Sequence, residues 1–114
     1  MKGGAQAIIT MGDPMVESNR GRIAAFALDH RLPAMGEFKP MAELGGLISY
    51  GPNQVAMWGR TAFYVDKTLK NANPANLPVE RPAKFELTIN LRTAKALGFD
   101  ISSNVLSLAD ELID

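Results

Sequence analysis

The sequence contains no cysteine and a single histidine, and these two absences exclude several kinds of site. Without cysteine there is no disulfide, no thiolate nucleophile and no sulfur ligand for a metal ion. A zinc site needs several ligands of the right type, and the lone imidazole of His30 does not supply them. No calcium-binding EF-hand spacing is present either. We therefore expect no metal and no cofactor, and we interpret His30 as a residue at a helix C-terminus.

An excess of charge is also missing, because 12 basic side chains balance 12 acidic ones. This balance gives no electrostatic argument for a nucleic-acid partner or an anionic membrane surface. The first apolar run, residues 7–11, is far shorter than the apolar core of a signal peptide or a membrane span. We therefore expect no nucleic-acid partner, and the sequence as written carries no signal peptide.

The residues that are present, 114 in all and 46% hydrophobic, suffice for one domain with a modest core. Residues 7–11 are apolar and compatible with a β-strand, so they predict a buried strand. Asp13 and Pro14 are typical of a helix start, and the helix is expected to continue to His30. Its buried face is expected to comprise Val16, Ile23, Phe26 and Ala27.

Two more short strands are predicted at residues 32–35 and 47–50, with a helical turn at residues 40–44 between them. A strand, a helix, a strand, a turn and a further strand follow one another along the chain. This order is typical of a parallel, doubly wound α/β sheet.

The strongest periodic pattern follows Pro52 and predicts a helix over residues 54–70. Residues 71–83 contain several asparagines and prolines and predict an extended connection. Residues 84–91 alternate between apolar and polar side chains, as a half-buried strand does. A short helix is expected to end at Gly98. The remaining residues predict a last helix from about Ser102 to Ile113, with its inward face formed by Val105, Leu108, Ala109 and Leu112.

Two carboxylates, Asp13 and Glu37, each follow a predicted parallel strand, so both are expected at the carboxyl edge of the sheet. Ligands bind at this edge in open α/β folds, and paired carboxylates can also support acid and base catalysis. Alternatively, Asp13 caps a helix and Glu37 is a solvated loop residue. Tyr50 ends a predicted strand, where its ring can line a cleft or cover the core. We find no set of nucleophile, base and orienting residue, so we do not expect an enzyme.

Several segments together resemble the C-terminal part of a family of bacterial ABC transporter substrate-binding proteins, in the group with tryptophan and tyrosine transport components. These segments are, in order, GDP, HRLPAM, GGLISYGPN, YVDKTLKNANPANLPVERPAKFELTINLRTAKALGFDIS and ADELI. The resemblance runs from about residue 7 to residue 114. It implies a lobe of a type I periplasmic binding protein, in which two α/β lobes joined by three crossovers clamp a small ligand. It also implies a periplasmic or other extracytoplasmic location, and delivery of the solute to an ABC permease.

On this resemblance the chain is one partial α/β domain, truncated because the first lobe is missing. Residues 5–50 would form the core of the second lobe, and residues 51–83 the hinge crossing and its helix. Residues 84–114 would form the returning strand and C-terminal helices. The helix over residues 54–70 would then normally cross to the missing first lobe.

The resemblance also implies a small-molecule ligand that is amino-acid-like, aromatic amino acids included, held in the cleft between lobes. Tyr50 or Phe38 would stack on this ligand, and Asp13 or Glu37 would accept a hydrogen bond from its ammonium group. The full set of expected contacts is Asp13, Met15, Glu37, Phe38, Tyr50 and Asn53. The alternative function is a small flavodoxin-like interaction or regulatory domain without a transported ligand.

The apolar face of the predicted long helix would be exposed if the first lobe were absent. We expect such a face to drive homodimerisation or segment exchange. The face comprises Val55, Trp58, Ala62, Val65 and Leu69.

Overall fold

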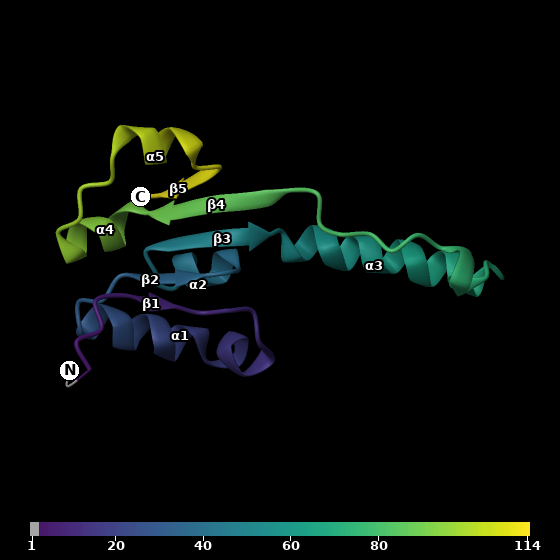
Figure 1. The fold of residues 1–114 in the computed structure, drawn as a ribbon, viewed down its shortest axis with the longest axis horizontal. Coiled ribbons are helices and arrows are strands. Elements are labelled where there is room, and N and C mark those ends of the chain that lie inside the picture. Colours follow the sequence, from purple (N-terminus) through teal and green to yellow (C-terminus); the bar gives the residue numbers. More distant parts are fainter. Residues whose placement is uncertain (1–2) are drawn as a thin grey trace.

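The computed structural model of the protein describes residues 3–114 as an α/β lobe from which a helical arm projects (Figure 1). The lobe contains a five-stranded sheet in the order β1-β2-β3-β4-β5. Strands β1, β2 and β3 are parallel, β4 runs antiparallel to β3, and β5 runs parallel to β4. The predicted α/β class is therefore confirmed, and the sheet is mostly rather than wholly parallel. The strands are β1 (Ile8–Ile9), β2 (Ala34–Gly36), β3 (Ile48–Pro52), β4 (Phe85–Asn90) and β5 (Glu111–Ile113).

Two helices, α1 (Pro14–Asp29) and α2 (Lys39–Glu43), cover one face of this sheet. Ala27 of α1 is buried against Leu32 and Ala34. Met41 of α2 is only 2% exposed, and it packs so tightly that a Cβ on Gly36 would lie 2.6 Å from its side chain. Burial of these apolar side chains supplies the main stabilisation of the lobe.

Helix α1 begins as predicted but differs from the sequence prediction at one buried position. Asp13 caps it, accepting a hydrogen bond from the Met15 N–H at 2.8 Å. Ala27 is buried as expected, whereas Phe26 is 45% exposed and stacks on His30 with ring centroids 4.1 Å apart. The prediction that Phe26 faces the core was therefore wrong, because the small Ala24 and Ala27 form the contact with the sheet.

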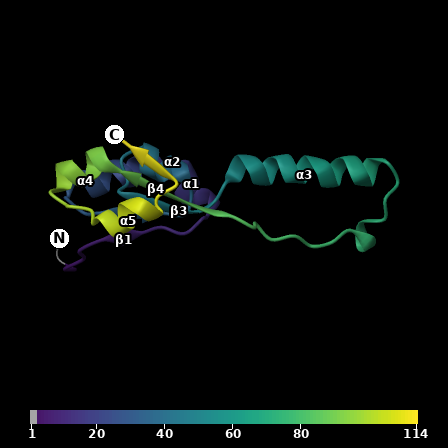
Figure 2. The ribbon, with the colours of Figure 1, turned by 90° about the horizontal axis from the view of Figure 1, so that it is seen from above.

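The arm consists of α3 (Gln54–Leu69) and the returning segment, residues 70–84, which contains a 3-10 turn at Pro74–Asn76 (Figure 2). Arg60 forms an ion pair with Glu80, and this pair lowers the pKa of the Glu80 carboxyl to about 2. The Tyr64 hydroxyl donates to the Pro78 carbonyl at 2.8 Å. These contacts hold the returning segment against one side of α3.

The other side of α3 is uncovered, and no residue of this helix is buried. Trp58 is 70% exposed and Leu69 is 78% exposed. The predicted helix is confirmed, and its apolar face lies in the open on an element that leaves the lobe.

The C-terminal segment corrects the prediction of a last helix up to Ile113. Helix α4 (Leu91–Leu97) ends at Gly98 in the left-handed conformation, as predicted, but α5 spans only Ser103–Leu108. Beyond it Asp110 exchanges two hydrogen bonds with the backbone of Leu87, both 2.8 Å long. The following residues pair with the free edge of β4 as β5. The residues expected inward on that helix are exposed at three positions, namely Val105, Leu108 and Leu112.

The sheet also differs from prediction at β1 and at β4. The expected buried strand over residues 7–11 is reduced to two residues at the sheet edge, where Ile9 is 71% exposed. Strand β4 is antiparallel because the chain leaves the end of β3 along the arm and returns beside it, without crossing a sheet face. In Figure 2, α5 and α2 lie on opposite sides of the sheet, and α1 packs on the side of α2.

Candidate functional site

The carboxyl ends of β1, β2 and β3 meet around the side chain of Glu37. Glu37 directly follows β2, and its Oε2 accepts a hydrogen bond from the Gly12 N–H at 2.7 Å. Gly12 lies beyond the end of β1, so the carboxylate bridges two strand ends. This is the edge of the sheet at which open α/β folds bind ligands.

Glycine at two positions allows this close approach. A Cβ on Gly12 would lie 2.3 Å from Glu37 Oε2, and a Cβ on Gly51 would lie 2.0 Å from the Glu37 carbonyl oxygen. A side chain at position 12 would push the Glu37 carboxylate off its hydrogen bond with the Gly12 N–H, and a side chain at position 51 would force two backbone segments apart. Both glycines therefore serve the contact of their backbones with Glu37.

Next to this carboxylate is a pocket of about 260 Å3 with mostly apolar walls. It is lined by Ile9, Thr10, Met11, Met35, Gly36, Glu37, Tyr50, Gly51 and Phe85. One acidic group beside an apolar wall is an arrangement that suits a ligand with a cationic group and an apolar part.

The aromatic part of this wall is a pair of rings on neighbouring strands. Tyr50 of β3 and Phe85 of β4 have ring centroids 5.7 Å apart, and each residue is 50% exposed. Phe85 pairs with Pro52 across the strands, which places its ring diagonally from Tyr50 on the same sheet face. The alternation over residues 84–91 predicts Phe85 on the apolar face of a half-buried strand, and it does not mark this residue as part of a site. The alternation of side chains along β4 predicts which face of the sheet Phe85 lies on. Only the register of β4 with β3 shows that its ring meets that of Tyr50.

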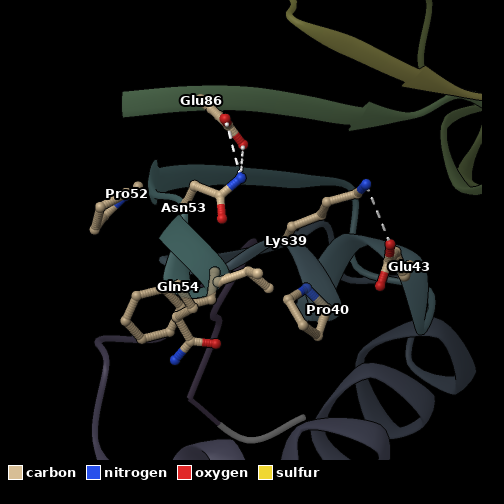
Figure 3. A pocket seen from close by; sticks show the side chains of 10 residues that line it. Lys39, Pro40, Glu43, Pro52, Asn53, Gln54 and Glu86 are labelled. Atoms are coloured by element: carbon tan, nitrogen blue, oxygen red, sulfur yellow. Dashed lines mark hydrogen bonds and ion pairs between the residues drawn. The ribbon is translucent and has the colours of Figure 1, made fainter. Parts of the chain in front are cut away.

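A second pocket, also of about 260 Å3, lies where the chain passes between lobe and arm. Asn53 caps α3 through the Ala56 N–H at 3.0 Å, and its Nδ2 donates to Glu86 at 3.3 Å. Figure 3 shows this contact joining the outgoing and returning segments, with Lys39 and Glu43 paired nearby. Phe38 lines the same pocket. This pocket therefore lies at the junction of the lobe and the arm, where Asn53 contacts both α3 and β4.

The six residues expected to contact a ligand are thus divided among four places. Glu37 and Tyr50 line the strand-end pocket, whereas Phe38 and Asn53 line the pocket at the crossing. Asp13 caps α1, which is the alternative role that the sequence indicated for this residue. Met15 is 72% exposed and lies in a groove along α1 with Phe26.

Within residues 3–114 no three histidine, cysteine or acidic side chains gather as they would around a metal ion. His30 lies at the end of α1, where its Nδ1 is 2.9 Å from the Phe26 carbonyl oxygen. None of the helices described combines the length and apolar character needed to cross a membrane.

The geometry assigns the chain to the open α/β folds whose sites lie at the carboxyl ends of parallel strands. The sequence matches the ABC transporter substrate binding protein family over residues 1–113, and the chain belongs to this family. The resemblance identified from the sequence is thereby confirmed. Proteins of this class are generally not enzymes. A comparison with curated proteins finds no match.

Three solved structures have a similar fold. A conserved domain protein from Vibrio cholerae is 27% identical, with a TM-score of 0.89, over 95% of this chain and 36% of its own. An ABC domain from Streptococcus pneumoniae in complex with L-Trp is 27% identical, with a TM-score of 0.89, over 96% of this chain and 37% of its own. A ligand-free, open substrate binding protein with adhesive properties from Clostridium difficile shares the fold, with a TM-score of 0.60 and 20% identity. The match covers 93% of this chain and 36% of that protein. The chain thus spans little more than a third of the length of these structures.

Proposed function

We propose that this chain is the second lobe and hinge segment of the solute-binding component of an ABC importer. The solute is a small amino-acid-like molecule bound between this lobe and a first lobe, and the protein acts outside the cytoplasm beside its permease. The observation that carries the proposal is the convergence of Glu37 with an apolar pocket at the carboxyl ends of three strands. The family assignment and the L-Trp complex of a structural neighbour support it.

The site explains why an amino acid suits this lobe. The Glu37 carboxylate supplies an acceptor for an α-ammonium group, and the neighbouring pocket supplies apolar surface for a side chain. Tyr50 lies on β3, the strand from which the chain leaves for the arm, two residues before that strand ends at Pro52. Domain closure about such crossings is the usual way in which two lobes enclose a ligand.

The test is a thermal-shift screen of the full-length protein against amino acids. A ligand that binds only the folded state raises the melting temperature, in proportion to the logarithm of its excess over Kd. We expect a rise with at least one amino acid and a smaller rise for Tyr50→Ala at the same ligand concentration. A full-length protein whose melting temperature responds to none of them would exclude this class of solute.

We further propose that the bare face of α3 packs on the first lobe in the full-length protein, and that it associates with a second copy in the isolated chain. Large exposed apolar faces are uncommon on monomers. We expect light scattering to report a dimer of the isolated chain, and Trp58→Glu to yield a monomer. Val79→Glu is the control, because Val79 is 98% exposed on the returning segment and outside this face. A compact wild-type monomer at high concentration would contradict the association.

A further inference from the structure

The arm leaves the lobe at the end of β3 and returns to it at the start of β4. The ladder between these two strands ends at the pair of Pro52 and Phe85, and the whole arm lies between these residues in the sequence. Within the arm, the ion pair of Arg60 and Glu80 holds the returning segment on α3. We therefore expect the arm to move as one body about the end of the ladder, to the extent that contacts across the junction allow it.

Asn53 makes such a contact, because the two ends of its side-chain amide bind different elements. Its Oδ1 accepts a hydrogen bond from the Ala56 N–H at 3.0 Å and thereby caps α3. Its Nδ2 donates to the Glu86 carboxylate on β4, at 3.3 and 3.4 Å from the two oxygens (Figure 3). Glu86 pairs with Gly51 across the strands, one pair before the ladder ends. A rotation of α3 about the junction must break one of these two bonds or displace β4.

The start of β4 is a fixed reference for this contact, since it is held from its other edge as well. Asp110, which precedes β5, exchanges two hydrogen bonds with the backbone of Leu87. Its Oδ1 also lies 3.8 Å from the Lys84 ammonium at the end of the returning segment. On β5, Glu111 pairs with Lys39 of α2 at 2.7 Å. The first residues of β4 are thus anchored to the lobe, and α3 is the element that remains to be oriented.

We infer that Asn53 is a positioning residue, which sets the direction of the arm by joining the start of α3 to Glu86 on β4. A hydrogen bond to an ionised acceptor is stronger than one between neutral groups, so a carboxylate suits this role. The contact lies within the chain and needs no solute, so the inference goes beyond the proposed function. With a first lobe packed on α3, as proposed above, the same contact would orient the two lobes.

The experiment exchanges the donor and the acceptor of this contact. Asn53→Asp keeps a good helix cap but places a second carboxylate against Glu86, so that repulsion replaces the hydrogen bond. Adding Glu86→Gln restores the contact in reverse, because the amide of glutamine can donate to the carboxylate at position 53. A purely structural loss at the cap would not be restored by a substitution on β4.

The readout is the distance between the arm and the lobe, measured by pulsed electron paramagnetic resonance on the full-length protein. Spin labels are attached to Lys70→Cys at the end of α3 and to Lys95→Cys on α4, both at exposed positions. Residues 1–114 contain no native cysteine, and any cysteine elsewhere in the full-length protein is replaced by serine.

We expect one main distance with the wild-type pair, an added population at a new distance in Asn53→Asp, and the wild-type distribution again in the double variant. Asn73→Asp is the matched control, because Asn73 also caps a helical turn, through the Ala75 N–H at 3.0 Å, but lies within the arm. This control should leave the distribution unchanged.

A distribution that is the same in the wild-type protein and in Asn53→Asp would overturn the inference. A change that the double variant does not reverse would overturn it as well, because the added charge and not the lost contact would then be the cause. The distances are measured without ligand, so they do not depend on the proposed function. Failure of that function would show separately, as a thermal-shift screen in which no amino acid raises the melting temperature.

Discussion

Gly51→Ala is expected to lower the free energy of unfolding by about 3 kcal/mol, because overpacking against a backbone atom cannot be relieved by a rotamer change. The new Cβ would lie 2.0 Å from the Glu37 carbonyl oxygen and 2.9 Å from the Glu37 Cγ. Strand β3 and the residues after β2 must then separate. Urea denaturation followed by circular dichroism measures the loss as a lower midpoint at an unchanged slope.

The matched control for this substitution is Gly21→Ala in α1. There the nearest heavy atom to the added Cβ is Leu44 Cδ1 at 4.0 Å, an ordinary contact. Alanine is favoured over glycine inside a helix, so we expect a gain of about 0.5–1 kcal/mol. Equal midpoints for Gly51→Ala and the wild-type protein would show that the strand ends tolerate a side chain at this position.

Local sequence patterns predicted those elements that are decided by neighbouring residues. Asp13 and Pro14 marked the start of α1, and Gly98 marked the end of α4, because capping and the left-handed conformation depend on a few adjacent residues. The apolar repeat after Pro52 predicted α3 without any knowledge of what covers it. The end of β2 just before Glu37 was also identified from sequence order, whereas β3 runs two residues beyond Tyr50, to Pro52.

Contacts between distant segments decided the parts that were not predicted. Residues 111–113 fit a helical pattern as well as a strand, and the free edge of β4 makes them β5. The partnership of Phe85 with Tyr50 depends on the register of β3 and β4, which are separated by the whole arm. The packing of Gly51 on the Glu37 backbone has no signature in either local segment.

The site and the fold share the same residues, and this affects how site variants must be designed. Glu37 fixes the Gly12 backbone while it lines the pocket, so its removal would change both the loop after β1 and the charge. A variant that keeps the hydrogen bond and removes only the charge separates the two roles. Glutamine has the same length, and its amide oxygen can accept from the Gly12 N–H.

Glu37→Gln in the full-length protein is therefore expected to weaken amino-acid binding by about thirty-fold, which corresponds to ~2 kcal/mol for a hydrogen bond to a charged group. Thermal stability without ligand should stay close to that of the wild-type protein, because the contact with Gly12 persists. The control ligand is the analogue of the bound amino acid that lacks the α-ammonium group, which should bind the wild-type protein and Glu37→Gln equally. Isothermal titration measures both affinities. A thirty-fold loss for both ligands would mean that Glu37 shapes the pocket rather than pairs with the ammonium, and unchanged affinity for both would remove Glu37 from the site.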